Sequence, residues 1–306
     1  MRGHSLLDFG DGGRLEGWGD VVLARPDSRA IGPRSLGPEA WDHADAAFEG
    51  RVGKGRWRVG RPQAGRSQTG RTLPDRWPIA HAGLRFHVGL APSGHTGLFP
   101  EQAAHWAWMA KALTSGVTPD VTPDVLNLFA YTGGASVALA TAGARVTHVD
   151  ASRPSIGWAR ENAALNGVST VRWIQEDARR FVDRERRRGR QYDALLLDPP
   201  AFGRGPAGDW QLDRDLPGLL ESSIALLRPD PAFVLLNVYT GDLDTDGLER
   251  LLAWALDVRP DAGGLGPIEA GTLALTSADG RQLPTGIYAR IGRQGPHHVC
   301  CHTHMA

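Results

Sequence analysis

The clearest pattern in the sequence is an alternation of short apolar runs with longer amphipathic segments, which extends from residue 125 to residue 256. Short apolar runs are typical of buried strands, and apolar residues spaced three and four apart are typical of helices. The pattern predicts strands at residues 125–130, 145–150, 170–175, 192–198 and 232–238. It predicts helices at residues 134–142, 154–166, 178–188, 213–227 and 245–256. Regular alternation of this kind predicts a doubly wound α/β fold with parallel strands and right-handed crossovers.

Further elements are expected on both sides of this alternating region. Residues 100–113 have helical character, and residues 268–275 and 286–291 are β-like segments joined by a turn that contains glycine and proline. We expect these last two segments to form an antiparallel hairpin at one edge of the sheet. Ser152 is typical of a helix N-cap, and Asn166-Gly167 is typical of the end of the same helix.

The first part of the chain has a different pattern of hydrophobic and polar residues. It lacks helical periodicity and has short β-like runs at residues 21–24, 57–59 and 84–88, separated by glycine and proline. We therefore expect three parts: a small β-rich module over residues 1–95 that contacts the substrate or RNA, a catalytic domain over residues 96–294, and a disordered tail over residues 295–306.

The fourth predicted strand ends in the sequence Asp198-Pro199-Pro200-Ala201-Phe202. Proline has no N–H and restricts the residue before it, so the backbone must leave the sheet at Asp198. The turn brings a carboxylate, exposed carbonyls and an aromatic ring to the edge of the sheet where open α/β proteins bind ligands. Such a group can hold a planar ring that carries an amino or imino group. An ordinary loop with a proline pair is the alternative.

A glycine-containing loop follows the first predicted strand, with the sequence Asn127-Leu128-Phe129-Ala130-Tyr131-Thr132-Gly133-Gly134. Paired glycines at the start of a helix let a ligand approach the backbone, and the helix N-terminus favours negative charge. The loop does not have the G-x-G-x-x-G pattern, so a dinucleotide is not favoured and an oxidoreductase is a weaker interpretation.

Two acidic residues end the next two strands. Asp150 is placed to accept hydrogen bonds from both hydroxyls of a ribose. Asp177 is placed to meet the amino edge of a purine, with the N–H of Ala178 beside it. Each acid alone could be a helix cap. Together with the glycine loop and the Asp-Pro-Pro turn, they predict a site for S-adenosylmethionine at one edge of the sheet.

Composition says more about the cellular compartment of the protein than about its activity. The 306 residues have no net formal charge, and 41% of them are hydrophobic. No apolar run is long enough to span a bilayer and no signal peptide is readable, so no membrane partner is expected. The two cysteines, Cys300 and Cys301, are adjacent, which excludes a disulfide framework and favours the reducing cytoplasm.

Local charge is less even than the total. Residues 51–76 contain eight cations and one acid, with Trp57 and Trp77 between them. Such a stretch fits contact with phosphates and stacking on bases, but a solvated loop fits equally well. The terminal residues 297–304 contain histidines and cysteines whose spacing matches no zinc module, so no metal site is expected.

At these motifs the chain resembles the class I S-adenosylmethionine-dependent methyltransferases, and within them the large-subunit ribosomal RNA methyltransferases that act on cytosine C5 or guanine N7. The resemblance covers residues 83–293 and includes His95-Thr96-Gly97-Leu98-Phe99-Pro100-Glu101-Gln102 and Glu176-Asp177-Ala178-Arg179. It implies a Rossmann-like sheet of seven strands with the last one antiparallel. The implied cofactor-binding residues are Phe99, Gln102, Asn127, Phe129, Tyr131, Thr132, Gly133, Asp150, Ala151, Asp177, Ala178 and Asp198.

The chain departs from these relatives at two places. Pro100-Glu101-Gln102 stands where the relatives have Leu-Asp and a basic residue. The cytosine-C5 enzymes also need a nucleophilic cysteine after the fifth strand, and this chain has Asn237-Val238-Tyr239-Thr240-Gly241 there. Methylation of a ring or exocyclic nitrogen of an RNA base is therefore the leading hypothesis.

In that hypothesis, the Asp198 carboxylate and the Pro199 carbonyl bind the acceptor ring, and Phe202 stacks on it. Phe129 or Tyr131 faces the sulfonium. The glycine-containing loop at residues 203–210 is either a lid or a passive connection. The alternatives are a methyltransferase that acts on a small molecule or a protein, and a non-catalytic protein that binds S-adenosylmethionine or RNA.

Overall fold

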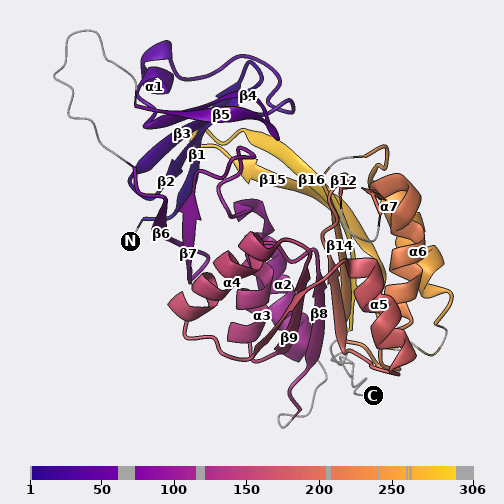
Figure 1. Ribbon diagram of the computed structural model, residues 1–306. Helices are drawn as coiled ribbons and strands as arrows, with labels where there is room; N and C mark the ends of the chain where they lie inside the picture. Colours follow the sequence, from indigo (N-terminus) through magenta and orange to yellow (C-terminus); the bar gives the residue numbers. More distant parts are fainter. Residues whose placement is uncertain are drawn as a thin grey trace, which may run out of the picture.

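The computed structural model contains two large β-sheets, one built from the first sixty residues and one from residues 124–292 (Figure 1). The structure describes residues 2–60, 73–114, 121–204, 208–239, 241–259, 261 and 264–293. The expected tail at residues 295–306 lies outside these described residues.

The larger sheet has seven strands in the order β10-β9-β8-β11-β14-β16-β15. Its strands are β8 (Asp124–Leu128), β9 (Arg145–Asp150), β10 (Val171–Gln175), β11 (Ala194–Leu197), β14 (Phe233–Val238), β15 (Glu269–Thr276) and β16 (Gln282–Gly292). The first five are parallel, whereas β16 is antiparallel to both β14 and β15. The predicted fold class and the antiparallel last strand are therefore confirmed.

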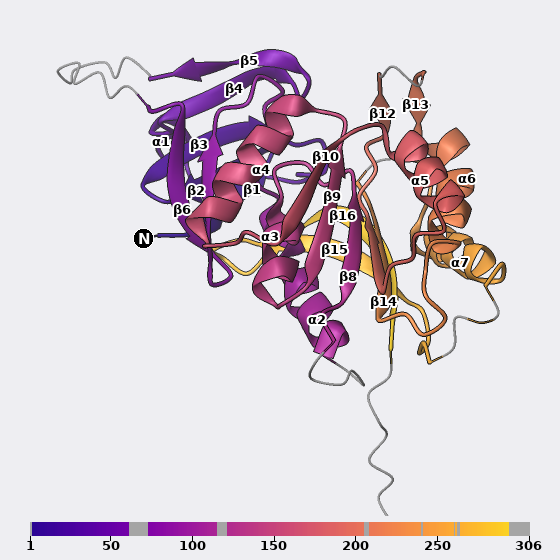
Figure 2. The same ribbon diagram turned by 60° about the horizontal axis from the view of Figure 1, so that its bottom comes forward.

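Helices cover both faces of this sheet (Figure 2). The helices α2 (Ala103–Thr114), α3 (Gly134–Thr141) and α4 (Arg153–Leu165) lie on one face, and α5 (Ala178–Arg187), α6 (Leu212–Ile224) and α7 (Thr245–Leu256) lie on the other. Neighbouring strand residues serve opposite faces, as the pleat requires: Leu196 packs in the first core, and Leu195 packs in the second. The apolar runs predicted from the sequence are therefore strands that are buried on both sides.

The N-terminal sheet has five strands in sequence order: β1 (His4–Gly10), β2 (Gly13–Trp18), β3 (Val21–Pro26), β4 (Ala46–Arg51) and β5 (Lys54–Val59). A short helix α1 (Pro38–Asp42) precedes β4, and the hairpin of β6 (Arg76–His81) and β7 (Leu84–Gly89) lies between the two sheets in the sequence. The sequence predicted three β-like runs, within β3, β5 and β7, and missed β1, β2, β4 and β6. Trp18 and Leu23 belong to the same buried cluster as the α2–α3 face of the large sheet, so the two sheets share a core.

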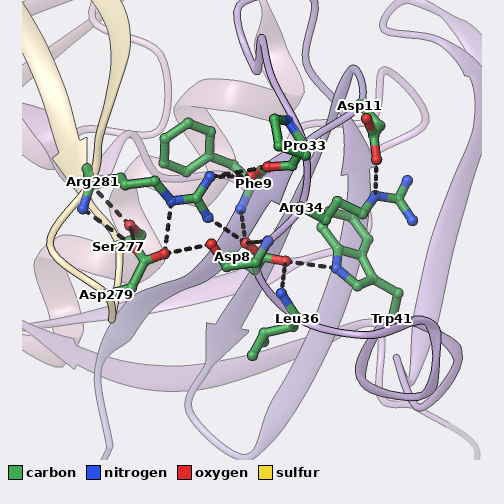
Figure 3. Close-up of polar contacts among 11 residues, drawn as sticks. Asp8, Phe9, Asp11, Pro33, Arg34, Leu36, Trp41, Ser277, Asp279 and Arg281 are labelled. Atoms are coloured by element: carbon green, nitrogen blue, oxygen red, sulfur yellow. Dashed lines mark hydrogen bonds and ion pairs between the residues drawn. The ribbon is translucent and has the colours of Figure 1, made fainter.

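The hairpin of β15 and β16 joins the two sheets, and Figure 1 shows it in yellow reaching from the large sheet to the N-terminal one. At its tip, Ser277 forms a parallel bridge with Leu6 of β1, and the Ala278 N–H donates to the Leu6 carbonyl at 3.0 Å. Figure 3 shows the polar contacts beside this bridge. The buried Asp8 carboxylate accepts from the Arg281 guanidinium at 2.6 Å and from the Trp41 indole N–H at 2.9 Å.

The charge of Asp8 is stabilised by its neighbours. Burial by itself favours the neutral acid, but hydrogen bonds from Leu36, Trp41, Ser35 and Arg281 outweigh it and lower the pKa of Asp8. The first strand and the turn before the last strand of the described chain are therefore joined by an ion pair between a buried carboxylate and a partly exposed arginine.

Candidate functional site

A cavity of about 1180 Å³ opens at the carboxyl ends of the parallel strands. One wall comes from the ends of β8, β9, β11 and β14, and the other comes from β2, β3 and the residues that follow β3. Ligand pockets usually measure about 300–1,000 Å³, so this one has room for two small ligands together. The predicted site residues that line it are Phe99, Phe129, Tyr131, Asp150, Ala151, Asp177, Asp198 and Pro199.

A second, smaller cavity of about 30 Å³ lies beneath the loop after β8. It shares Phe99, Phe129, Tyr131 and Asp198 with the large one and adds the predicted residues Gln102, Asn127, Thr132 and Gly133. The structure therefore brings twelve of the fourteen predicted site residues to one place. Ala178 and Phe202 are the two that do not line either cavity.

The loop after β8 is held in an unusual backbone conformation. Phe129 and Tyr131 have positive φ angles of 56° and 49°, and Gly133 has a φ of 84°. Side chains other than glycine rarely adopt this region, and such residues cluster at ligand sites. The left-handed turn at Phe129 also ends β8 at Leu128, two residues before the predicted strand end.

Packing fixes the same loop from behind. A Cβ atom at Gly133 would lie 2.9 Å from the Cβ of Ala159, so only glycine lets the loop lie on α4. The Thr132 hydroxyl donates to the Gly97 carbonyl at 2.5 Å, and the Asn127 amide donates to Ser136 at 2.9 Å. These contacts with the rest of the protein therefore hold the backbone of the loop at the cavity.

Asp150 ends β9 with its carboxylate on the cavity wall. It accepts from the backbone N–H groups of Tyr131 and Ser152, each at 2.8 Å. Burial outweighs these hydrogen bonds and raises its pKa. The two backbone donors orient the carboxylate, and its remaining lone pairs can accept from a ligand hydroxyl.

Asp177 borders the cavity and also caps α5. Its side chain accepts from the backbone N–H groups of Arg179 and Arg180 at 3.0 and 3.3 Å. The structure therefore confirms that this acid is a helix cap, and its contact with a purine stays a prediction. Ala178, the first residue of α5, is only 5% exposed and does not line the cavity.

Trp210 holds the Asp-Pro-Pro turn in place. Its indole N–H donates to the Pro200 carbonyl at 2.7 Å, and its ring packs on Phe129 with centroids 5.1 Å apart. The ends of the loop at residues 203–210 pair as the short strands β12 (Phe202–Gly203) and β13 (Trp210–Gln211), while residues 205–207 of the expected lid lie outside the described part.

The Phe202 ring does not lie in the cavity, which corrects the prediction that it stacks on the acceptor. It is 50% exposed, whereas Ala201 and Gly203 on either side of it line the cavity. Successive residues of an extended strand point to opposite sides, so Phe202 in β12 faces away from the site.

Asp198 takes part in a small polar network at the centre of the site. The Gln102 amide donates to Asp198 Oδ2 at 2.7 Å and to the Tyr239 hydroxyl at 3.0 Å. The other oxygen, Oδ1, is buried and has no hydrogen-bond partner in the part of the chain that the structure describes. Burial raises the pKa of Asp198 to about 7, against the opposing effect of the Gln102 hydrogen bond.

Sequence reasoning missed several residues of the site. Tyr239 follows the fifth parallel strand, where the relatives' cysteine was sought, and its phenol lies in the Asp198 network. Glu101 lines the cavity, and burial raises its pKa. The position of Tyr239 at a strand end was a usable signal. The arginine wall of the cavity consists of Arg14 in β2, Arg25 in β3 and Arg29 after β3. No signal in the sequence predicted it, because these residues meet the site only in the folded chain.

The proposed base-stacking role of Trp57 and Trp77 is wrong for the described structure. The Trp57 indole donates to the Ala91 carbonyl at 2.7 Å, and the Trp77 indole donates to the Trp18 carbonyl at 2.8 Å. Trp77 is buried and Trp57 is partly buried against the core, so neither offers a free ring face. Residues 61–72 of this basic stretch lie outside the described residues.

Membrane-spanning helices and metal-binding clusters are both absent from the described residues. Within them, no helix combines the length and the apolar composition that are needed to cross a bilayer. They also contain no group of three acidic, histidine or cysteine side chains that could hold a metal ion. The histidines and cysteines at residues 297–304 are outside the part that the structure describes.

Comparison with known proteins agrees with the geometry. A sequence profile described as "S-adenosylmethionine-dependent methyltransferase" matches residues 28–238. The solved SAM-dependent methyltransferase from Agrobacterium tumefaciens superimposes with a TM-score of 0.85 at 38% identity, over 96% of this chain and 91% of that one.

Curated relatives match a shorter region. The ribosomal RNA large subunit methyltransferase K/L of Pseudoalteromonas atlantica is 34% identical over 55% of this chain. The protein of the same name from Shewanella frigidimarina is 39% identical over 37% of it. These matches cover 23% and 16% of the relatives, so the chain spans less than a quarter of their length.

Proposed function

The chain belongs to the S-adenosylmethionine-dependent methyltransferases, and from that premise we propose that it methylates a ring or exocyclic nitrogen of a base in RNA, with ribosomal RNA the leading candidate. The observation that carries the proposal is the Asp198 carboxylate. It lies on the Asp-Pro-Pro turn and lines both cavities, and its buried Oδ1 has no hydrogen-bond partner among the described residues.

The residues of the loop after β8 fit the cofactor. Asp150 offers oriented carboxylate oxygens for ribose hydroxyls, and Asp177 borders the region expected for the adenine. Phe129 and Tyr131 offer ring faces that suit a cation. Bound S-adenosylmethionine supplies a methyl group that its sulfonium already activates for transfer.

The protein then has to position the acceptor and receive one proton. Asp198 Oδ1 can accept a hydrogen bond from an N–H of the base, and the Pro199 carbonyl can accept a second. The nitrogen gives its electron pair to the methyl carbon, the carbon–sulfur bond breaks, and the nitrogen loses a proton. Asp198, whose pKa is about 7, is suited to take that proton near neutral pH.

Cytosine-C5 chemistry is not part of the proposal. That reaction needs a thiol at the acceptor, and the residue after β14 on the cavity wall is Tyr239. The phenol of Tyr239 is hydrogen-bonded to Gln102, and burial raises its pKa well above its usual value, so it stays neutral. A neutral tyrosine can position Gln102 but cannot add to a pyrimidine ring as a thiolate does.

The RNA acceptor is supported by the names of the curated relatives, which are ribosomal RNA methyltransferases. We propose further that residues 1–95 form the module that meets the acceptor, since β2 and β3 supply the far wall of the cavity, and that residues 96–294 form the catalytic domain. An RNA acceptor and the paucity of cysteine fit a cytoplasmic enzyme. A small-molecule or protein acceptor is the alternative.

The test uses the purified protein and methyl-labelled S-adenosylmethionine with total RNA from a strain that lacks the gene. Digestion and mass spectrometry then identify any labelled nucleoside. We expect one N-methylated nucleoside, whereas 5-methylcytidine would overturn the argument from the missing thiol. If the protein binds the cofactor and labels no RNA, the acceptor is a protein or a small molecule.

A further inference from the structure

The far wall of the large cavity contains an arginine that is only partly satisfied by its neighbours. Arg14 in β2 lines the cavity, and its side chain is only 12% exposed. Its Nε is buried and has no hydrogen-bond partner among the described residues. The nearest carboxylates, on Glu16 and Asp27, lie at 3.4 and 3.7 Å, which is ion-pair distance but longer than a good hydrogen bond.

The neighbouring acids are already engaged by other arginines. Glu16 Oε2 accepts from Arg25 Nε at 2.7 Å and from Arg25 Nη2 at 2.5 Å. Asp27 accepts from the Arg29 guanidinium at 3.0 and 3.2 Å. Of the three guanidinium groups that face these two carboxylates, the one on Arg14 lies at ion-pair distances of 3.4 and 3.7 Å, and its Nε has no hydrogen-bond partner among the described residues.

The other titratable groups nearby do not remove this positive charge. Burial and the charges of Arg25, Arg14 and Arg29 lower the pKa of His95 on the cavity wall to about 4, so it is neutral at physiological pH. Burial raises the pKa of Glu101 on the same wall, against the opposing charge of Arg14. The arginine wall therefore places three guanidinium groups on this side of the cavity.

A nearly buried guanidinium whose Nε–H makes no hydrogen bond is costly, because that donor has lost water and gained no hydrogen-bond partner. An oxyanion relieves that cost, since its two oxygens match the planar fork of donors. We propose that Arg14, supported by Arg25 and Arg29, binds an oxyanion of a ligand that lies in the same cavity as Asp198.

Two ligands of the site carry such a group. One is the acceptor, whose nearest phosphate would lie on Arg14 while its base meets Asp198. That assignment rests on the proposed function. The other is the cofactor, whose amino-acid part ends in a carboxylate. Both groups are oxyanions that a guanidinium can bind. Binding experiments on the intact protein distinguish the acceptor phosphate from the cofactor carboxylate.

The experiment compares paired ligands that differ only in the oxyanion. The acceptor arm measures nucleoside 5′-monophosphates against nucleosides, and the cofactor arm measures S-adenosylmethionine against its decarboxylated form. In one of the arms we expect the protein to prefer the anionic ligand by about tenfold or more, as charge-assisted hydrogen bonds imply. Arg14→Gln should reduce that preference to near one, and Arg14→Lys should keep part of it.

The control is Arg2→Gln, which also removes one cation from the N-terminal sheet but at an 82% exposed side chain paired with Asp20. It should leave both preferences unchanged. The proposal is overturned if the unmodified protein prefers the anionic ligand in neither arm, a result that needs no variant to fold. It is also overturned if folded Arg14→Gln keeps the full preference. Neither arm depends on methyl transfer, so failure of RNA labelling would reject the proposed acceptor and leave this subsite standing.

Discussion

At the scale of the residue, the most consequential group is Asp198. Its Oδ2 is held by Gln102, its Oδ1 has no hydrogen-bond partner among the described residues, and burial raises its pKa to about 7. The sequence predicted that this acid belongs to the site, and the structure places it on the wall of both cavities, while its role in the reaction stays a prediction. It did not predict the shifted pKa, which arises from burial among groups that are distant in the sequence.

Replacing Asp198 with Ala should abolish methyl transfer while leaving cofactor affinity within a few-fold. The unmodified enzyme needs the carboxylate ionised to accept a proton, so its turnover should rise with pH up to about 7 and then level off. Single-turnover assays across pH, together with calorimetric cofactor binding, check both statements. Persistent turnover in the folded Ala variant would reject Asp198 as the acceptor-binding group.

Asp198→Asn should stabilise the protein at high pH. The folded-state pKa of Asp198 is raised above the unfolded value, so the wild-type protein loses stability as pH rises from about 4 to 7. The amide cannot ionise and avoids this loss, with an expected gain of a few kcal/mol above pH 7 and almost none near pH 4. Denaturant unfolding at the two pH values measures it. An equal effect at both would contradict the shifted pKa.

Gly133→Ala should weaken both the fold and cofactor binding. The added Cβ meets Ala159 at 2.9 Å and must also adopt a φ of 84°. Gly143→Ala is the matched control, because its φ is 94° but the space around it is open. We expect a loss of about 1–2 kcal/mol for the control and more for Gly133→Ala. Only Gly133→Ala should reduce cofactor affinity. Equal effects of the two variants would contradict this account.

At the scale of the element, the strands of the large sheet were predictable and those of the N-terminal sheet were not. Strands such as β11 and β14 are buried on both faces, so they read as continuous apolar runs. β2 instead buries the charged Glu16, which Arg25 of β3 neutralises, and this breaks the apolar alternation that marks a strand. The site loops at the ends of β8, β9, β10 and β11 were predictable as well, because the end of each apolar run marks where the loop begins. The arginine wall was not, because pairing between β2 and β3 creates it.

Trp210→Phe tests how one element supports the reacting turn. The change keeps the ring on Phe129 but removes the indole N–H that donates to the Pro200 carbonyl. We expect a loss of about 1–2 kcal/mol in the free energy of unfolding and a lower kcat, because the Asp-Pro-Pro turn is less firmly held. Trp254→Phe, on an exposed residue of α7, should alter neither. Unchanged kcat in Trp210→Phe would show that the hydrogen bond does not position the turn.

At the scale of the whole molecule, the cavity lies between two sheets whose relative position depends on shared packing and on the β15–β16 hairpin. The Asp8–Arg281 pair is the polar part of that joint (Figure 3). The lowered pKa of Asp8 means that this stabilisation is present above the unfolded value of about 4 and is lost as pH falls through the folded value.

Arg281→Gln should therefore loosen the joint. It leaves the buried Asp8 carboxylate without its cation, and we expect a loss of about 1–3 kcal/mol at neutral pH, with a smaller loss at pH 3. Limited proteolysis of the N-terminal sheet should become faster. Arg2→Gln, at an exposed pair, should behave like the wild type. Wild-type proteolysis rates in Arg281→Gln would show that apolar packing alone holds the two sheets together.

The same joint has a consequence for how the protein is made. The arginine wall is encoded within the first thirty residues, yet β1 receives its partner at Ser277 and its cation at Arg281 only when the hairpin arrives. During translation, the N-terminal strands leave the ribosome long before that hairpin does. A nascent chain therefore carries every motif of the cofactor loop before the hairpin that fastens the two walls of the cavity is made, and we expect activity only once β15 and β16 have emerged.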